Sequence, residues 1–250
     1  LRVELVAMAF MLLGAINFAT HFSAWRGRSL LAYRRCPEAL YFLAIALGTG
    51  MIVSVFLFVQ GVYPDFGEAL RYGMFNTISV ITTTGFANTD YGSWPLFATV
   101  LMLLVSCFAA SSGSTGGGIK LIRLLLLVRQ ARYELLRLVH PKAIAPLRLG
   151  QRPVDSRVLL AVVGFLVLYL TSLGLGTLLL LASGLDGLTA FTATLSSLNN
   201  TGPGLGMVGP AGSYADMNGW QITLCTFAML LGRLELATVL VLFTPMFWRR

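Results

Sequence analysis

Two apolar segments of this chain are too short to cross a membrane as helices, and each ends in a polar turn that contains threonine and glycine. The first, Phe66 to Ile81, leads into TTTGF at residues 82–86, and the second, Leu188 to Leu198, leads into NNTGPG at residues 199–204. A helix needs about 20 apolar residues to cross a bilayer. Irregular backbone at membrane depth is tolerated only where protein encloses it or where it lines a watery path. The pattern therefore predicts re-entrant segments whose ends lie inside an enclosed pathway.

Composition places the chain among membrane proteins, because 56% of its 250 residues are hydrophobic and only 11% are charged. The excess of 18 Lys and Arg over 10 Asp and Glu lies mostly in loops between apolar runs. It therefore indicates membrane orientation, and no nucleic-acid partner is expected. The cysteines Cys36, Cys107 and Cys225 have no paired or metal-binding spacing. The chain opens inside an apolar run without an initiator methionine, which predicts a piece of a longer protein.

Longer apolar runs predict full membrane spans over residues 3–25, 39–60, 158–183 and 220–248. A further span starts at Leu96 and is interrupted by the glycine-rich stretch SSGSTGGG at residues 111–118. It resumes from Ile119 to Val128, and a basic stretch at residues 129–157 follows.

The same unit of span, half-span, polar turn and span therefore occurs twice. An offset of 117 residues superposes identical residues in both units: Thr77 on Thr194, Ser79 on Ser196, Thr84 on Thr201 and Gly85 on Gly202. Internal repetition is a common way to build a membrane pathway. We expect residues 1–30 to be the last helix of a preceding unit, residues 31–152 to form one complete unit and residues 153–250 the next.

Charge placement favours a topology in which both half-spans leave and return on one side of the membrane. The loops 26–38 and 120–157 and the C-terminus then share the other side, which the positive-inside rule makes cytoplasmic. That side carries 15 of the 18 basic residues: Arg26, Arg28, Arg34, Arg35, Lys120, Arg123, Arg129, Arg132, Arg137, Lys142, Arg148, Arg152, Arg157, Arg249 and Arg250. The opposite face carries an acidic mouth that would concentrate cations: Glu4, Asp65, Glu68, Asp90, Asp186 and Asp216.

Backbone carbonyls of the two polar turns are the candidate ligands for a transported ion. Carbonyls can replace the hydration shell of a cation, and glycine permits the backbone geometry that this requires. Each half-span would act as a pore helix whose C-terminal dipole end favours a cation. Neither turn holds a carboxylate, so we expect a monovalent cation on carbonyls of both turns: Thr83, Thr84 and Gly85, and Asn200, Thr201 and Gly202. The alternative is that both turns are ordinary helix connections.

The glycine-rich stretch will not hold a regular helix, because each glycine is about 1 kcal/mol less favourable there than alanine. If the pathway is continuous, this segment lies below the two polar turns, which would act as an ion filter. There it can obstruct the pore and clear it again. A kink without function is the alternative. The candidate gating loop consists of Ser111, Ser112, Gly113, Ser114, Thr115, Gly116, Gly117 and Gly118.

Charges within the apolar segments are further candidates, because a charge in a membrane span normally faces the protein interior. Arg233 has three alternatives: an ion pair with Glu235, hydrogen bonds to carbonyls of the gating loop, or projection into the pathway. A structural clamp and a role in conduction both stay open. Arg71 lies within the first half-span, where only nearby Glu68 offers it a partner.

These features together resemble the Trk/Ktr/HKT superfamily of potassium transporters, and most closely its bacterial TrkH-type membrane subunits. The resemblance is carried by TTTGF at 82–86, SSGSTGGGIKLIR at 111–123, NNTGPGLG at 199–206 and GRLELATVLVLFTPMFWRR at 232–250. It implies an all-α polytopic membrane protein of potassium-channel-like architecture, in which four helix–pore helix–filter–helix units surround one pore. The two complete units here would be the third and fourth.

The resemblance also implies roles for individual residues. The filter would comprise Thr83, Thr84, Gly85 and Phe86 in one unit and Asn200, Thr201, Gly202 and Pro203 in the next, with K⁺ at Thr83, Thr84, Asn200 and Thr201. Residues 111–118 would be the intramembrane gating loop, with Arg233 and Lys120 as its associated charges.

The resemblance implies partners as well: a homodimer in the cytoplasmic membrane and a cytoplasmic, nucleotide-binding regulatory subunit of the TrkA kind on the basic surface 120–157. Any nucleotide would bind that partner, and no cofactor is expected in this chain.

The sequence thus predicts gated, channel-like uptake of potassium, with or without sodium. An alternating-access symporter that moves K⁺ with Na⁺ or H⁺ is the alternative, since broken helices and repeats also serve carriers. The two short turns after half-spans favour the channel-like filter. No enzyme is expected, because the span interiors offer no His–Asp or His–Glu constellation.

Overall fold

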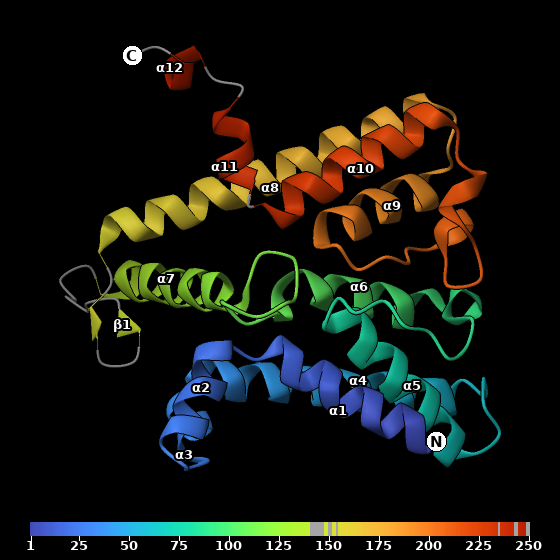
Figure 1. Ribbon diagram of the computed structural model, residues 1–250, viewed down its shortest axis with the longest axis horizontal. Coiled ribbons are helices and arrows are strands. Elements are labelled where there is room, and N and C mark those ends of the chain that lie inside the picture. Colours follow the sequence, from blue (N-terminus) through green and yellow to red (C-terminus); the bar gives the residue numbers. More distant parts are fainter. Residues whose placement is uncertain (141–147, 150–151, 154, 235, 243–244, 249–250) are drawn as a thin grey trace.

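The computed structural model describes residues 1–140, 148–149, 152–153, 155–234, 236–242 and 245–248. Its long helices lie side by side in three rows (Figure 1). Helices α6 and α7 form the middle row, α1 and α4 lie on one side of it, and α8 and α10 lie on the other.

The helices have the following bounds: α1 Arg2–Ala15, α2 Phe18–Arg26, α3 Leu31–Arg35, α4 Pro37–Val59, α5 Phe66–Ile81, α6 Leu96–Ala109, α7 Leu121–Val139, α8 Ser156–Ala182, α9 Gly187–Asn199, α10 Gly219–Arg233, α11 Leu236–Val241 and α12 Pro245–Trp248. Three short 3-10 turns lie at Tyr91–Ser93, Gly206–Val208 and Tyr214–Asp216. A minimal hairpin pairs β1, Arg148–Leu149, antiparallel to β2, Arg152–Pro153.

The expected all-α membrane fold is confirmed. Among the described residues, α4 and α8 are long and apolar enough to cross a membrane alone, and the bent pair α1–α2 adds a third span if it counts as one. The half-span Phe66–Ile81 is helix α5, with the bounds that the sequence predicts. The second half-span is α9, which starts one residue earlier than expected and ends one residue later.

The predicted repeat is visible as α4–α5–α6 and α8–α9–α10. In each set the short helix packs on the long helix that precedes it and turns its C-terminal end toward the middle of the molecule (Figure 1). Each short helix also begins with an aspartate cap: the Asp65 side chain accepts from Gly67 N, and the Asp186 side chain accepts from Thr189 N. The domain boundaries at residues 30 and 152 remain predictions.

Two spans that the sequence predicts to be continuous are broken, so that prediction is wrong. The run 3–25 divides into α1 and α2, which are bent by 96° at Ile16 and Asn17. The run 220–248 divides into α10, α11 and α12. The interruption after α6 is as predicted, but α7 continues to Val139 through residues that the sequence analysis assigns to a basic loop.

The break in α1 has a physical cause in the glycine-rich loop at residues 111–118, which bonds the carbonyls that the helix leaves unpaired. Gly14 O accepts hydrogen bonds from Thr115 N (3.2 Å) and Thr115 Oγ1 (3.0 Å), and Ala15 O accepts one from Ser111 N (3.3 Å). Asn17 then caps α2 by accepting from Ala19 N at 2.8 Å. An apolar run that looks continuous is thus divided by partners far away in sequence.

Helix α5 lies unusually close to α4 because glycine faces serine at their contact. A Cβ added at Gly73 would lie 2.5 Å from Ser54 Oγ and 3.0 Å from Ser54 Cα. Small residues at helix contacts allow this approach in membrane proteins. The position of the first polar turn therefore depends on Gly73.

We predict that Gly73→Ala lowers the stability of the purified protein by about 1–3 kcal/mol, because the methyl group pushes α5 away from α4. Gly48→Ala is the matched control, since a Cβ there meets no atom within 4 Å. The control should leave the thermal unfolding midpoint in detergent unchanged or raised. Equal midpoints for the two variants would show that the close contact does not position α5.

Candidate functional site

The first polar turn is a compact, hydrogen-bonded end to α5. Thr84 N donates to Ser79 O at 2.9 Å and Thr83 N donates to Val80 O at 3.1 Å. The Thr82 hydroxyl lies 2.8 Å from Ile78 O, to which it donates, and 2.9 Å from Thr84 Oγ1. Thr83 has φ +54° and Gly85 has φ +81°, both in the left-handed region.

The second polar turn has the same backbone at the offset of 117 residues. Thr201 N donates to Ser196 O at 3.0 Å and Asn200 N donates to Ser197 O at 3.1 Å. Asn200 has φ +54° and Gly202 has φ +100°. Because these bonds and angles match those of the first turn, the four sequence identities reflect a structural repeat.

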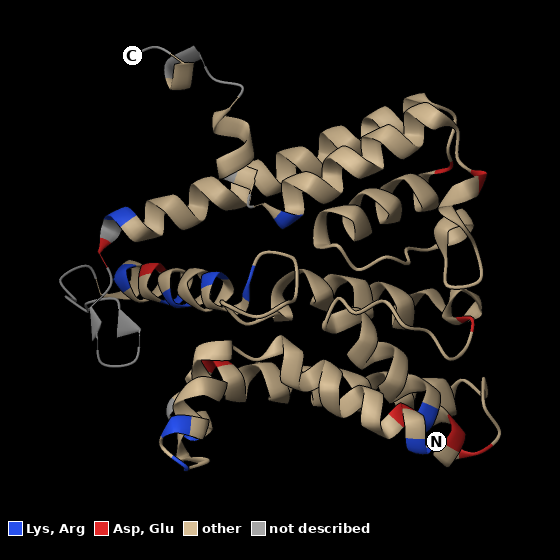
Figure 2. Cartoon of the chain, viewed as in Figure 1, with Lys and Arg blue, Asp and Glu red and all other residues tan. Residues whose placement is uncertain are grey.

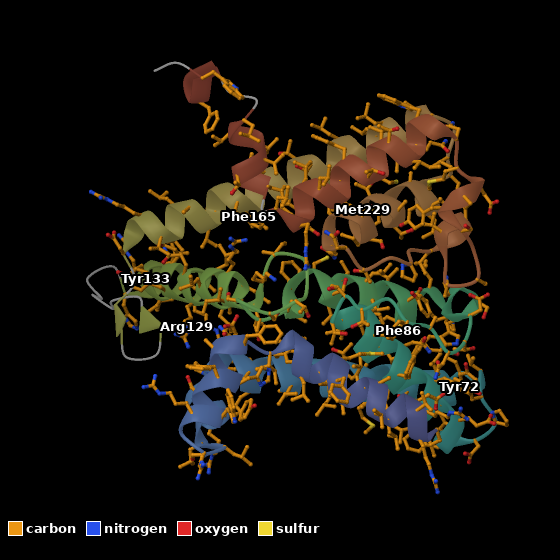
Figure 3. All side chains as sticks on the ribbon, in the orientation of Figure 1. Tyr72, Phe86, Arg129, Tyr133, Phe165 and Met229 are labelled. Atoms are coloured by element: carbon orange, nitrogen blue, oxygen red, sulfur yellow. The ribbon has the colours of Figure 1, made fainter. Side chains whose placement is uncertain are left out.

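The two turns meet, which the sequence alone does not establish. A Cβ added at Gly85 would lie 2.2 Å from Thr201 O and 3.1 Å from the Pro203 ring. Only glycine fits at position 85, because the backbone there has a positive φ and because Thr201 O leaves no room for a Cβ. Thr84, Phe86 and Gly202 are exposed, whereas Thr201 is buried. Figure 3 shows Phe86 on the segment that follows α5, near the middle of the molecule.

Several carbonyls of the turns accept no hydrogen bond from the described residues. They are the carbonyls of Thr83, Thr84, Gly85, Asn200 and Thr201. The carbonyl of Gly202 differs, because it accepts from Ser196 Oγ at 2.7 Å and from Tyr214 Oη at 3.0 Å. Unpaired backbone oxygens at this depth need water, an ion or further protein as a partner.

The glycine-rich loop at residues 111–118, the candidate gating loop, contacts the first turn and the end of α9 before the second. Gly117 N donates to Thr83 Oγ1 at 2.9 Å, and a Cβ added at Gly117 would lie 1.8 Å from Asn199 O. A Cβ added at Gly116 would lie 3.5 Å from Thr82 O. The consecutive glycines therefore let the loop lie against the ends of both short helices.

Arg233 and Lys120 bind carbonyls of this loop. Arg233 Nη1 donates to Thr115 O at 3.0 Å, and Lys120 Nζ donates to Gly116 O. Of the alternatives for Arg233, the described residues show the hydrogen bond to the loop, whereas Glu235 lies outside them. Lys120, Arg233 and Arg123 line a cavity of about 200 Å³ beside Gly116–Gly118, and Phe165 forms part of its wall. Figure 3 labels Phe165 on α8. The Arg123 guanidinium stacks 3.8 Å from the centre of that ring.

A polar network behind the first turn was missed at the sequence level. Arg71 donates from Nε and Nη2 to the two carboxylate oxygens of Glu4, at 2.7 and 2.8 Å. Asn88, just after the first turn, donates to Glu4 at 3.1 Å and accepts from the buried Asn76 at 2.6 Å. Arg71 therefore pairs with α1 rather than with Glu68. A charge inside an apolar half-span signalled a partner within the protein, but the identity of that partner depends on the neighbouring unit.

A second network, which is buried, anchors the end of α9. Tyr169 Oη donates to Asn199 Oδ1 at 2.8 Å, and Asn199 Nδ2 donates to Ser106 Oγ at 3.3 Å and to Cys107 Sγ at 3.6 Å. Asn199 is fully buried. The network joins α6, α8 and α9 beside the glycine-rich loop, since Ile119 N, just after that loop, donates to Cys107 O at 2.7 Å.

Side-chain metal ligands do not gather in the described part of the chain, where no group of three or more His, Cys, Asp or Glu could hold a metal ion. The chemistry that the site offers is backbone oxygen, supported by hydroxyl and amide groups. Such oxygens suit hard monovalent cations.

Known proteins of one family match this chain over its whole length. The family described as TrkH, cation transport protein, matches residues 1–250. The chain is 40% identical over 247 residues to the Trk system potassium uptake protein TrkH of Salmonella typhimurium and 37% identical over 247 residues to TrkG of Escherichia coli. These matches cover 99% of this chain.

The crystal structure of the potassium transporter TrkH from Vibrio parahaemolyticus superposes with a TM-score of 0.93 and 39% identity, covering 99% of this chain and 53% of that one. The chain spans about half the length of the curated relatives, 51% of the Salmonella protein and 50% of TrkG. These relatives are transporters rather than enzymes. The chain therefore belongs to the TrkH family of cation transport proteins.

Proposed function

We propose that this chain forms two walls of a gated, channel-like pathway for potassium uptake. The observation that carries the proposal is the contact between the two matched turns, in which Thr201 O lies against Gly85. The relatives named above are potassium uptake proteins of the Trk system, and their named activity supports the choice of ion. In the four-unit arrangement, the two turns are the filter segments of adjacent units.

Unpaired carbonyls would replace water around the ion. At Thr83, Thr84 and Gly85 the sign of φ alternates from positive to negative to positive, and the second turn repeats this at residues 200–202. Such alternation lets successive carbonyls face the same side of the chain, as a cation filter requires. We place K⁺ at the carbonyls of Thr83, Thr84, Asn200 and Thr201, with Gly85, Phe86, Gly202 and Pro203 completing the filter.

The outer mouth would attract cations. Figure 2 shows Asp and Glu at the end of the molecule from which both short helices start. Asp65 and Asp186 cap those two helices. Hydrogen bonds from Thr189 hold the pKa of Asp186 below its usual value, so this carboxylate stays charged at neutral pH and somewhat below. A negative entrance raises the local cation concentration.

The gating loop would close the pathway beneath the filter. Its glycines lie against the ends of both short helices, and Lys120 and Arg233 place positive charge beside it. Positive charge next to a closed loop opposes a cation electrostatically. Opening would require the loop to release Thr83 and the carbonyl that Arg233 binds.

The basic end of the molecule is where we place the cytoplasm. Figure 2 shows Lys and Arg gathered on α2, α3, α7 and the start of α8, at the end opposite the acidic mouth; Lys142, Arg249 and Arg250 lie outside the described residues. By the positive-inside rule, the protein is then a multi-pass protein of the cytoplasmic membrane. A nucleotide-binding regulatory subunit would contact α7, whose Arg129, Arg132 and Arg137 lie near that end, and a homodimer is proposed from the family resemblance.

We predict that Gly85→Ser in the complete protein lowers the preference for K⁺ over Na⁺ by at least about tenfold, a change of about 1.4 kcal/mol. The new side chain would collide with Thr201 O and separate the two filter segments. Rubidium and sodium uptake into proteoliposomes measure the ratio. Gly187→Ser, at an open position with ordinary φ at the start of α9, is the control that keeps the ratio. An unchanged ratio in Gly85→Ser refutes the filter assignment.

We predict that Thr83→Val raises the resting rubidium leak about fivefold, because losing the acceptor of Gly117 N weakens the closed loop by about 1 kcal/mol. Valine keeps the shape of threonine, so the backbone should stay in place. Thr83→Ser keeps the hydroxyl and should leak no more than the parent protein. A leak in Thr83→Val equal to that in Thr83→Ser would remove this hydrogen bond from the gate.

A further inference from the structure

The 96° bend after α1 turns a short helix across the direction of the long helices, at the basic end of the molecule. Helix α2 exposes three aromatic side chains there: Phe18 at 52%, Phe22 at 56% and Trp25 at 80%. Exposed aromatic residues on a helix that lies across the membrane normal are typical of a bilayer interface.

The hairpin of α2 and α3 also carries uncompensated positive charge. Arg26, Arg28 and Arg34 are exposed, and no described residue forms an ion pair with them. The sequence holds no Asp or Glu between Glu4 and Glu38. Glu38 is itself occupied, because it accepts a hydrogen bond from Ser112 N at 2.6 Å. The hairpin therefore presents a positive surface that is open to an external anion.

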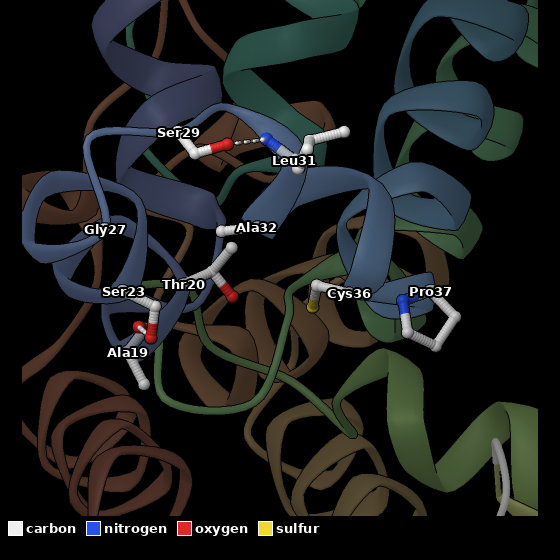
Figure 4. Close-up of a pocket in the computed structure, with 9 residues that line it drawn as sticks. All are labelled: Ala19, Thr20, Ser23, Gly27, Ser29, Leu31, Ala32, Cys36 and Pro37. Carbon is white, nitrogen blue, oxygen red and sulfur yellow. Dashed lines mark hydrogen bonds between the residues drawn. The ribbon is translucent and has the colours of Figure 1, made fainter.

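Two hollows flank the Gly27–Leu31 turn of this hairpin. One, of about 750 Å³, lies between α2, α3 and the start of α4, where Thr20, Ser23, Ser29 and Cys36 provide polar groups (Figure 4). Ser29 Oγ accepts from Leu31 N at 3.3 Å and keeps its own proton to donate. The other, of about 380 Å³, is lined by Trp25, Arg28 and Ser29 together with His21 and Tyr33. Hydroxyl and guanidinium donors at the rim of an apolar surface suit a phosphodiester.

We propose that the α2–α3 hairpin binds the headgroup of an anionic phospholipid from the cytoplasmic leaflet. The three arginines pair with the lipid phosphate and its neighbours, the hydroxyl groups of the larger hollow receive the glycerol part, and Phe18, Phe22 and Trp25 lie among the upper acyl chains. Each basic residue near an anionic surface contributes about 1 kcal/mol. The assignment to the cytoplasmic leaflet rests on the orientation in the proposed function, whereas the lipid preference does not.

Quenching of Trp25 by brominated lipids tests this proposal with the complete protein in vesicles. The Trp25 signal is the difference between the parent protein and its Trp25→Phe variant. Brominated phosphatidylglycerol in a phosphatidylethanolamine bilayer is compared with brominated phosphatidylethanolamine at the same mole fraction. We expect the relative association constant from Trp25 quenching to be about fivefold or more higher for phosphatidylglycerol than for phosphatidylethanolamine. One contact between an arginine and the anionic headgroup is worth about 1 kcal/mol, which corresponds to that ratio.

Removing arginines from one region at a time then distinguishes a lipid site on the α2–α3 hairpin from attraction of anionic lipid by the net positive charge of the whole basic end. Replacing Arg26, Arg28 and Arg34 together by Gln should abolish the selection, whereas replacing Arg129, Arg132 and Arg137 on α7 by Gln should retain it. Equal quenching by both lipids in the parent protein, or selection that survives the first triple replacement, overturns the proposal. So does the absence of quenching by either lipid, because it would mean that protein covers this face. None of these readings depends on transport, so failure here leaves the proposed function standing.

Discussion

Backbone groups freed by broken helices impose the central constraint on this structure. In a membrane interior these groups must find protein partners, because lipid offers none. The loop between α6 and α7 supplies partners at two helix ends: it bonds Gly14 and Ala15 at the end of α1, and Ile119 N bonds Cys107 O of α6. Arg233, at the end of α10, donates from its side chain to Thr115 O of the loop. Helices α1, α6 and α10 end close together in the view of Figure 1, and the loop contacts residues at all three ends.

The same loop is the candidate gate, and it contacts both segments of the candidate filter region directly. Gly117 lies between Thr83 of the first turn and Asn199 at the end of α9, and it has no room for a side chain. Asn199 in turn is fixed by Tyr169 and by the α6 residues from which the loop departs. Movement of the loop would therefore break a contact to each filter segment, which gives gating a direct route to ion coordination.

Local pattern was enough to predict the half-spans, the two polar turns and the interruption at residues 111–118. These features depend on neighbouring residues: the aspartate caps, the short apolar length and the runs of glycine. The breaks in α1 and α10 were not predicted, because long apolar runs surround the few polar residues at them. In α1, the partners that satisfy the freed backbone are about a hundred residues away. Asn17 was the available local signal, as a polar helix-capping residue inside an apolar run.

The partners of the charged residues also could not be predicted from the sequence. Arg71 had Glu68 nearby in sequence, but geometry pairs it with Glu4 on α1. Arg233 had three alternatives that differ only in the direction of one long side chain, and spacing along a helix cannot decide between them. The contact between Gly85 and Thr201 depends on how the two repeats pack against each other. A repeat in the sequence does not give the relative orientation of its two copies.

The central claim is that backbone carbonyls of the two turns hold the transported ion. Anomalous diffraction from crystals of the complete protein soaked in rubidium or thallium tests it most directly. The account predicts a peak between the carbonyls of residues 83–84 and those of residues 200–201, which disappears when sodium alone is present. A cation bound instead at the acidic mouth, with no density between the two turns, would contradict it.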